Sequence, residues 1–435
     1  MIRGQFKVRL FFAIVALCLV WGPLSAASLP DEIALLLKSH PRLLAARNNI
    51  SAADAGVERA FGEYLPSLDL ATDYGYENVD SPGLRAARNN RPLNGTREAF
   101  SITLTENLFT GFRREANNET ARLNRAVADI EYDATEQEIL FEAASSYLNV
   151  LRHAALIGFA VGNEQTIRRQ LKLEDERVKR GAGITVDVLQ SKSRLQIAKE
   201  RRVAFEGNLR NAVARYTQVF GAPPEVASMT APEPPLGLLP SRIEEAEAIA
   251  LAENPVVANS GRAVEIAAER KRRAQSPYYP EVDLIGQYNY EQDDEGVIGT
   301  RRDYVIKVEA RWNLFTGFST RADVADATFR NLAAVDNHAF VNRKVLEDVR
   351  LSWDQLATVR DRVELLENAV NIASEVYVAR NKRRLAGQET LLDLLDAENE
   401  VFNAQISAAD AAFDSRIAVY RLLFAIGRMT PDTIL

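Results

Sequence analysis

The apolar residues of this chain follow two different periods, and the longer period predicts long helices. Over residues 113–180 apolar and small side chains recur every three or four positions; they include Ile139, Ala143, Ser146, Tyr147, Val150 and Leu151. Residues 319–385 repeat the pattern. Each stretch predicts one helix, or two nearly coaxial helices, that rise roughly 100 Å at about 1.5 Å per residue. A rod of that length does not fold into a compact globule.

A period of two appears in four shorter stretches and predicts β-strands. In the first stretch an apolar face alternates with a polar one; the two faces are Leu68, Leu70, Thr72, Tyr74 and Tyr76, and Asp69, Ala71, Asp73, Gly75 and Glu77. Its partner stretch and the last stretch show apolar faces made of Phe100, Ile102, Leu104 and Leu108, and of Tyr304, Ile306, Val308, Ala310, Trp312 and Leu314. A half-buried sheet of a soluble protein shows the same alternation, so the pattern alone leaves the environment open.

Aromatic residues at the ends of these stretches favour a membrane environment. One end of the hairpins carries Tyr76, Phe100, Tyr290 and Tyr304, and the other carries Tyr64, Phe109, Tyr278 and Trp312. Two aromatic bands about ten alternating residues apart are typical of membrane barrel strands. Four strands cannot close such a barrel, because an open edge in lipid leaves backbone groups unpaired. We therefore expect an oligomer with eight strands from a dimer or twelve from a trimer.

The predicted elements occur twice along the chain. YLPSLDLATDYGYE at 64–77 aligns with YYPEVDLIGQYNYE at 278–291, and NLFTGF occurs at both 107–112 and 313–318. In this hexapeptide we expect Asn107 and Asn313 to leave the strand, the threonine to cap a helix, and Gly111 and Gly317 to permit the change of direction. The predicted segments are a signal peptide over 1–27, a helix–β-hairpin–helix repeat over 28–220, a Pro-rich linker over 221–240 and a second such repeat over 241–435.

Composition narrows the function classes. Residues 1–27 combine basic residues, a short apolar run and small residues before a cleavage site, as secretory signals do, and their removal changes the net charge from −7 to −10. The single cysteine, Cys18, lies inside this signal, so the mature chain has no disulfide and no cysteine-based metal site. An acidic exported protein is a poor candidate for nucleic-acid binding. No histidine spacing, phosphate loop or nucleophile pattern is present, which predicts no catalytic residue, no cofactor and no metal.

In their order, twice over, these motifs resemble the TolC family of outer-membrane channel-tunnels. The resemblance rests on the YLPSLDL and YYPEVDL strand openings, the doubled NLFTGF and the segments TVDVLQSKSRL and TLLDLLDAENE. It implies a mainly α fold with a small transmembrane β part: a homotrimer whose α-helical barrel continues into a 12-stranded antiparallel β-barrel. It also implies a passive duct in the outer membrane without catalysis. A periplasmic adaptor and an inner-membrane ABC or proton-driven transporter would dock with the duct to export proteins or small toxic compounds.

The resemblance also implies roles for residues near two helix turns. Asp393 and Asp396, three residues apart on one helix face, match the family's acidic ring at a closed periplasmic gate, and Asp187 is the equivalent position in the first repeat. A solvated acidic face is the alternative. The tips resemble the family's adaptor contacts, or serve simply as turns; they comprise Gly181, Gly183, Thr185, Gly387, Glu389 and Thr390. This chain carries Glu389 where some relatives carry a basic residue, which argues against an ion-pair latch at that position.

Three alternatives stay open from the sequence. The loop arginines Arg85, Arg88, Arg91, Arg97, Arg301 and Arg302 either contact lipopolysaccharide phosphates or belong to solvated loops. Within the duct hypothesis, the missing lipidation cysteine and the regular two-copy pattern resemble secretion-type members more than efflux members. The rival from another class is a secreted coiled-coil structural or adhesive rod, which has no need for four alternating stretches with aromatic ends.

Overall fold

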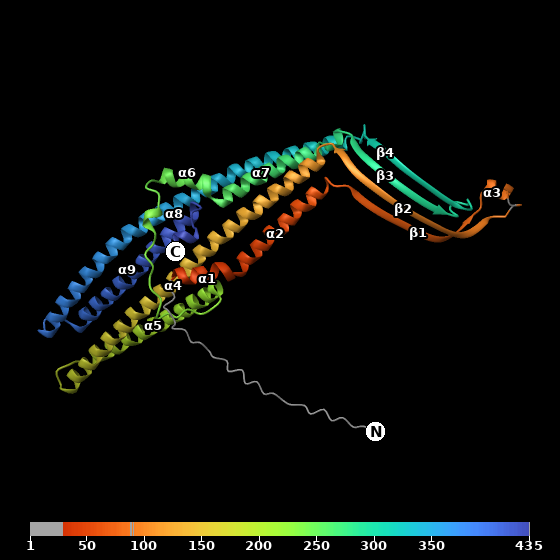
Figure 1. The fold of residues 1–435 in the computed structure, drawn as a ribbon. Helices are drawn as coiled ribbons and strands as arrows, with labels where there is room; N and C mark the ends of the chain where they lie inside the picture. Colours follow the sequence, from red (N-terminus) through yellow and green to blue (C-terminus); the bar gives the residue numbers. More distant parts are fainter. Residues whose placement is uncertain (1–28, 88, 90, 435) are drawn as a thin grey trace, which may run out of the picture.

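The chain forms a long helical rod that ends in a curved β-sheet. The computed structural model describes residues 29–434 except 88 and 90, so the predicted signal peptide over 1–27 lies outside the described residues. Figure 1 shows the sheet at one end of the rod and two helix hairpins at the opposite end. The fold is therefore mainly α with a small β part, as the two periods of the sequence predict.

The elements follow one another in the same order in both repeats. The helices are α1 (Leu29–Ser39), α2 (Pro41–Gly62), α3 (Pro82–Ala87), α4 (Arg113–Lys179), α5 (Thr185–Phe220), α6 (Ile243–Glu253), α7 (Pro255–Ala274), α8 (Ser319–Leu385) and α9 (Leu391–Ala425). The strands are β1 (Ser67–Val79), β2 (Leu93–Thr110), β3 (Glu281–Gln292) and β4 (Thr300–Arg311), and short 3-10 turns are η1 (Leu236–Leu238), η2 (Ser276–Tyr278) and η3 (Pro431–Thr433). Only α3 has no counterpart in the second repeat among the described helices.

The two long rods are single continuous helices. Helices α4 and α8 each contain 67 residues, so the alternative of two coaxial helices is wrong for both. Near the sheet, α2, α4, α7 and α8 lie side by side, and toward the hairpin ends the contacts run through α5, α4, α9 and α8. The protomer thus presents four helices at either level. Within the described part of the chain, no helix has the length and apolar character needed to cross a membrane.

Equivalent breaks separate the short helices of each repeat. The α1–α2 break is capped by His40, whose Nδ1 accepts a hydrogen bond from the Arg42 backbone N–H at 3.2 Å. The α6–α7 break is capped by Asn254, whose Oδ1 accepts from the Val256 N–H at 2.8 Å. A proline follows each cap at the first helical position, where its missing N–H costs no hydrogen bond. The same local chemistry therefore ends one helix and starts the next in both repeats.

The four strands form one antiparallel sheet in the order β1-β2-β3-β4. Leu68 pairs with Leu104 in the first hairpin, and the repeat-equivalent Val282 pairs with Ala310 in the second, so the hairpins share one register. A bulge between Asn107 and Phe109 interrupts β2. After the bulge Phe109 pairs with Val282, so the prediction that Leu108 continues the apolar alternation is wrong. The bulge inserts an extra residue into β2, which shifts the alternation by one position.

The main hydrophobic core lies midway along the rod. Side chains from α1, α4, α6, α8 and α9 meet there, and Tyr147 and Tyr420 are fully buried. Burial of each large apolar side chain contributes roughly 1.5–3 kcal/mol. The Tyr147 hydroxyl donates to the Thr230 carbonyl at 3.0 Å and accepts from its N–H at 3.2 Å, while Met229 is buried beside them. These contacts hold the segment between the repeats against the core.

Candidate functional site

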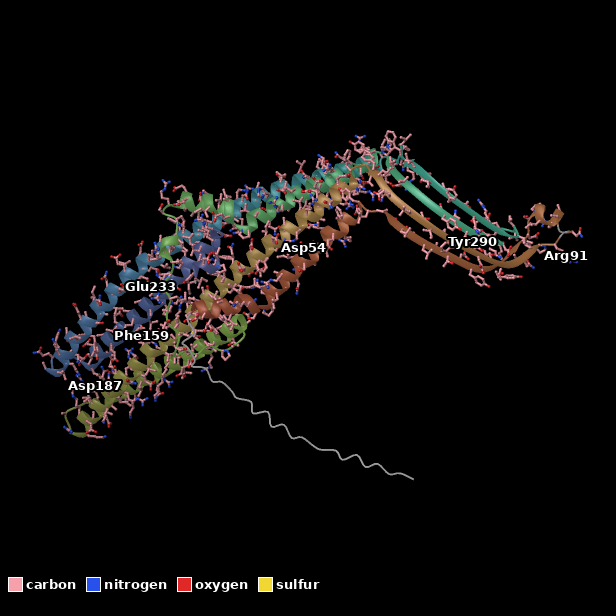
Figure 2. All side chains as sticks on the ribbon, in the orientation of Figure 1. Asp54, Arg91, Phe159, Asp187, Glu233 and Tyr290 are labelled. Atoms are coloured by element: carbon pink, nitrogen blue, oxygen red, sulfur yellow. The ribbon has the colours of Figure 1, made fainter. Side chains whose placement is uncertain are left out.

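The residues predicted for the periplasmic gate lie at the helix hairpins, far from the sheet. Figure 2 shows Asp187 near the end of the α4–α5 hairpin, while Tyr290 lies on the sheet and Arg91 at the opposite end of the molecule. The turns themselves use positive φ angles at Gly181 (73°) and Gly387 (75°). Glycine adopts these angles without the steric cost of a Cβ atom, so the chain reverses direction within a few residues at each tip.

The two tips differ in how the following helix begins. Helix α9 is capped by Thr390, whose Oγ1 accepts from the Asp393 backbone N–H at 3.2 Å and also bonds the Asp393 carboxylate. The equivalent cap of α5 is Ile184, which makes no side-chain cap hydrogen bond. Gly181, Thr185, Gly387 and Thr390 are exposed, whereas Gly183 and Glu389 are partly buried.

The predicted ring residues Asp393 and Asp396 have different partners within one protomer. The Asp393 carboxylate lies 3.5 Å from Arg380 of its own hairpin, and the Asp396 carboxylate lies 2.6 Å from Arg194 of the other hairpin. The hydrogen bond from Thr390, followed by the Arg380 charge, lowers the pKa of Asp393. The mutual rise in pKa expected of a crowded ring requires carboxylates from further copies, so it stays a prediction.

The arginine Arg384, which the sequence analysis missed, joins the two hairpins at their tips. Its guanidinium lies 3.0 Å from Glu174 of α4 and 3.3 Å from Asp187 of α5. Arg177 contacts the same Glu174 carboxylate at 3.2 Å. The Glu174, Asp187 and Arg384 side chains are 6%, 15% and 17% exposed, so water screens this cluster less than a surface pair. A positive charge late in α8 was visible in the sequence, but its partners are about two hundred residues away.

Glu389 also forms ion pairs. Here the tip residue supplies the negative charge, whereas a basic latch residue would supply the positive one. Its carboxylate lies 3.0 Å from Arg383 and 3.6 Å from Arg380, and its side chain is 11% exposed. Both arginines belong to α8, so these contacts close one hairpin rather than join two. The departure at Glu389 therefore removes no ion pair from the tip. Ion pairs between the hairpins are made instead by Arg384 with Glu174 and Asp187, and by Arg194 with Asp396.

The strand-to-helix junctions keep the threonine and glycine roles that the NLFTGF hexapeptide predicts, but the prediction that Asn107 leaves the strand is wrong. Asn107 pairs with Asp283, and β2 continues to Thr110 because the bulge after Asn107 lets the ladder resume, whereas Asn313 lies beyond the end of β4. Thr110 Oγ1 accepts from the Arg114 N–H at 3.2 Å, and its equivalent Thr316 accepts from the Thr320 N–H at 3.4 Å. Glycine and phenylalanine then adopt consecutive positive φ angles: Gly111 (62°), Phe112 (67°), Gly317 (60°) and Phe318 (67°). A Cβ atom on Gly111 would lie 2.5 Å from the Ser276 carbonyl oxygen, so only glycine fits there.

The predicted aromatic bands occupy both ends of the sheet region, although not all their members are strand residues. Phe100 pairs directly with Tyr290 across β2 and β3, and Tyr304 pairs with Tyr288 one step further toward the helices. Tyr76 pairs with Thr96 nearer the loop. At the helical end only Phe109 is in a strand; Tyr64 follows α2, Tyr278 ends η2 and Trp312 follows β4. The assignment of these residues to lipid interfaces stays a prediction.

The outer loops neutralise several of their own arginines. Arg85 lies 3.1 Å from Asp80, Arg97 lies 3.2 Å from both Asp73 and Asp294, and Arg301 lies 3.6 Å from Glu291. Arg302 stacks over the Tyr290 ring, and Arg88 lies outside the described residues. These internal partners reduce the positive charge that the loops present outward, and the choice between a solvated loop and a phosphate-binding surface stays a prediction. Elsewhere, the described residues contain no group of three or more His, Cys, Asp or Glu side chains placed to hold a metal ion.

Comparison with known proteins places this geometry in a family. The family described as outer membrane efflux protein matches residues 33–222 and 248–428, one match in each repeat. Outer membrane protein TolC of Escherichia coli is 24% identical over 419 residues, covering 91% of this chain and 81% of that protein. Proteases secretion protein PrtF of Dickeya chrysanthemi is 21% identical over 450 residues, covering 97% of this chain and 92% of that protein.

Solved structures show the same fold. The outer membrane protein VceC of Vibrio cholerae superposes with a TM-score of 0.79 at 20% identity, covering 92% of this chain and 96% of that one. The family match spans most of both repeats, including the strands, the NLFTGF junctions and both tips. The chain therefore belongs to the outer membrane efflux protein family and is an outer-membrane protein with a large periplasmic helical part.

Proposed function

We propose that three copies of this outer-membrane exit duct assemble into one continuous channel. The four strands of each copy would then complete a twelve-stranded barrel, and the four helices at each level would complete a ring of twelve. Twelve strands satisfy the requirement that a sheet in lipid has no open edge. The proposed units within each copy are the repeats 28–220 and 241–435, the linker 221–240 and a cleaved signal over 1–27.

The observation that carries the proposal is the contrast between the two NLFTGF junctions. Ser276 and Tyr279 of the second repeat cover the first junction, where Phe109 and Phe112 pack edge-on against the Tyr279 ring. The second junction has no such cover in the protomer: Phe315 and Phe318 are 72% and 69% exposed. A Cβ atom on Gly317 would meet no atom within 4 Å.

Repeat symmetry identifies what would cover the second junction. Ser276 aligns with Gly62, which lies just before β1, so Gly62 and its neighbours in another copy would take the same position. The pairing of β4 with the neighbouring β1 then follows the pairing of β2 with β3. Because Ser101 pairs with Asn289, the equivalent pair between copies is Lys307 with Gly75. Both belong to the polar face, which would line the water-filled lumen.

Engineered disulfides test this register. We expect Lys307→Cys combined with Gly75→Cys to form oxidised trimers on denaturing gels, because the Cβ atoms of directly paired strand residues lie about 4.5–5.5 Å apart. Lys307→Cys combined with Ala71→Cys, displaced by four residues, serves as the matched control and should stay monomeric. The only natural cysteine lies in the predicted signal peptide. Monomers from both pairs, in protein extracted from outer membranes, would overturn the proposed assembly.

The gate and its partners are proposed from the tips. The tip residues face away from the sheet and are largely exposed, which suits contact with a periplasmic adaptor and, through it, an inner-membrane ABC or proton-driven transporter. Asp393, Asp396 and Asp187 would line the periplasmic entrance. Contacts of Arg384 across the hairpins would stabilise the closed arrangement. The alternative of a secreted coiled-coil rod gives the exposed apolar strand face no role. Membrane fractionation separates the two: carbonate would extract a rod from membranes, whereas extraction of the duct would need detergent.

A further inference from the structure

A buried carboxyl without a counter-ion lies in the periplasmic helices close to the tips. Glu398, on α9, is 7% exposed, and both of its carboxylate oxygens lack a hydrogen-bond partner among the described residues. The side-chain oxygen of Gln170, on the adjacent α4, is buried and lacks a partner as well. The oxygens of Glu398 and Gln170 therefore lie buried in one region, where the Gln170 amide is a neighbouring donor but no ion pair is made among the described residues. Unpaired buried acceptors destabilise a folded structure, so protonation of the carboxyl, which adds an O–H donor, would stabilise this arrangement.

The charged groups around Glu398 are engaged elsewhere. On α5, Arg194 lies 2.6 Å from Asp396, and Arg201 donates to Asn399 at 3.0 Å. On α4, Arg169 acts on the carboxyl only at a distance, and on α8 Tyr377 faces the same region. Among the ion pairs of the described residues, none includes Glu398. The carboxylate form is therefore buried without a contacting cation, although arginines lie nearby.

Burial has a direct consequence for the protonation of this group. It raises the pKa of Glu398 to about 7, and the Gln170 amide and the Arg169 charge oppose the rise only in part. The carboxyl is thus partly protonated near neutral pH. In its neutral form it gains an O–H donor, which the buried acceptor of Gln170 lacks.

The position is specific to the second repeat. Its equivalent in the first repeat is Lys192, an exposed residue on α5. The fold therefore does not require a carboxyl at this point in a helix that follows a tip.

We propose that Glu398 is a proton-binding site through which the pH of the periplasm sets how tightly α9 packs on α4, and hence how readily the tips separate. This inference rests on the proposed duct and adds its regulation. Protonated Glu398 stabilises the packed hairpins. Ionised Glu398 favours separated hairpins, because water then solvates the charge.

The direction of the pH effect follows from linkage. When the hairpins separate and expose Glu398, its pKa returns toward the ordinary 4.5, whereas in the packed state it is about 7. The packed state therefore receives its full stabilisation below about pH 4.5, and loses it as the pH rises to about 7. The difference between these pKa values limits the effect to about a 300-fold change in the packed-to-separated ratio per protomer. The duct should open more readily at neutral pH than at acid pH.

Conductance of the purified full-length oligomer in planar bilayers tests the proposal. We expect wild-type conductance to rise between about pH 5 and about pH 7.5, since Glu398 ionises across that interval. Glu398→Gln, which stays neutral at all pH values, should keep the low conductance of acid pH throughout. Glu400→Gln is the matched control, because Glu400 is exposed on the same helix two residues away, and it should behave as wild type.

The outcomes separate this inference from the proposed duct. Histidine titration, common to all three proteins, cancels in the comparison between variants. A Glu398→Gln oligomer that retains the wild-type rise in conductance would overturn the proton site while leaving the duct intact. Failure of the wild-type protein to form any channel would overturn the duct itself, and this inference with it.

Discussion

At the scale of single residues, the tips depend on which charges face one another. Asp393 and Asp396 were expected from the sequence to act as a pair, yet in one protomer they contact arginines from different hairpins. Both carboxylates remain about half exposed, at 45% and 56%. They thus keep enough contact with water to attract cations at a pore entrance. Their role in a ring is a prediction that needs the assembled channel.

Removal of both carboxylates tests the ring. We expect Asp393→Ala with Asp396→Ala to raise single-channel conductance and to weaken block by divalent cations, because the site of concentrated negative charge is lost. Glu400→Ala, one turn further along the same helix, removes an exposed carboxylate outside the proposed ring and should leave block unchanged. Equal divalent block in the double variant and the wild type would retire the ring assignment.

At the scale of elements, the two helix hairpins are coupled at their tips by few polar contacts. The contacts that join them include Arg384 with Glu174 and Asp187, Arg194 with Asp396, and Arg201 with Asn399 and Asn403. By contrast, Arg380 and Arg383 act within the second hairpin only. Separation of the hairpins at the tips would break this small set of polar contacts, while each hairpin would keep its own internal packing.

Arg384 offers a test of this coupling. Arg384→Met keeps an unbranched side chain but leaves Asp187 without its cation and Glu174 with Arg177 alone, at a cost of roughly 1–3 kcal/mol to the closed arrangement. We expect higher conductance of the channel in planar bilayers and easier opening. Arg383→Met is the control, since the 62% exposed Arg383 forms its ion pair with Glu389 of its own hairpin. The coupling idea fails if the two variants conduct alike.

At the scale of the whole molecule, the single protomer leaves large apolar surfaces uncovered. Its sheet has apolar side chains exposed on β1 and β4, among them Leu68, Leu70, Tyr304 and Ile306. Phe315 and Phe318 at the second junction are exposed, whereas Ser276 and Tyr279 cover the equivalent first junction. In the proposed closed barrel, lipid would cover the apolar strand face and a neighbouring copy would cover the junction, whereas a single chain in water would expose both.

The class of exported substrate can be identified by deleting the gene in cells. We expect deletion of the gene either to make cells more sensitive to small toxic compounds or to abolish a secreted protein, since the relatives are named for both processes. The regular repeats resemble secretion-type members, so loss of a secreted protein is the expected result. Growth inhibition assays and analysis of culture supernatants measure the two outcomes. A deletion strain with neither defect would contradict the proposed export role.

Much of the fold could be read from local patterns, because helices and strands impose their periods on nearby residues. The apolar spacing predicted the long rods at 113–180 and 319–385, and the structure confirms them as α4 and α8. The duplicated hexapeptide predicted both junctions, and Thr110 and Gly111 have the capping and turning roles expected of them, although Asn107 stays in the strand. The bulge that displaces Leu108 was not predictable, since no glycine or proline marks it.

The pairing of charges and the burial of single polar groups depended on contacts between segments far apart in the chain. Arg384 meets Glu174, and Glu398 is buried against α4, because two hairpins built from separate repeats pack side by side. A linear sequence lists charges and their spacing along one helix, but it does not say which helix faces which. Periodicity therefore sufficed for the elements and their duplication, whereas the packing of α4 and α5 against α8 and α9 settled which side chains meet at the tips.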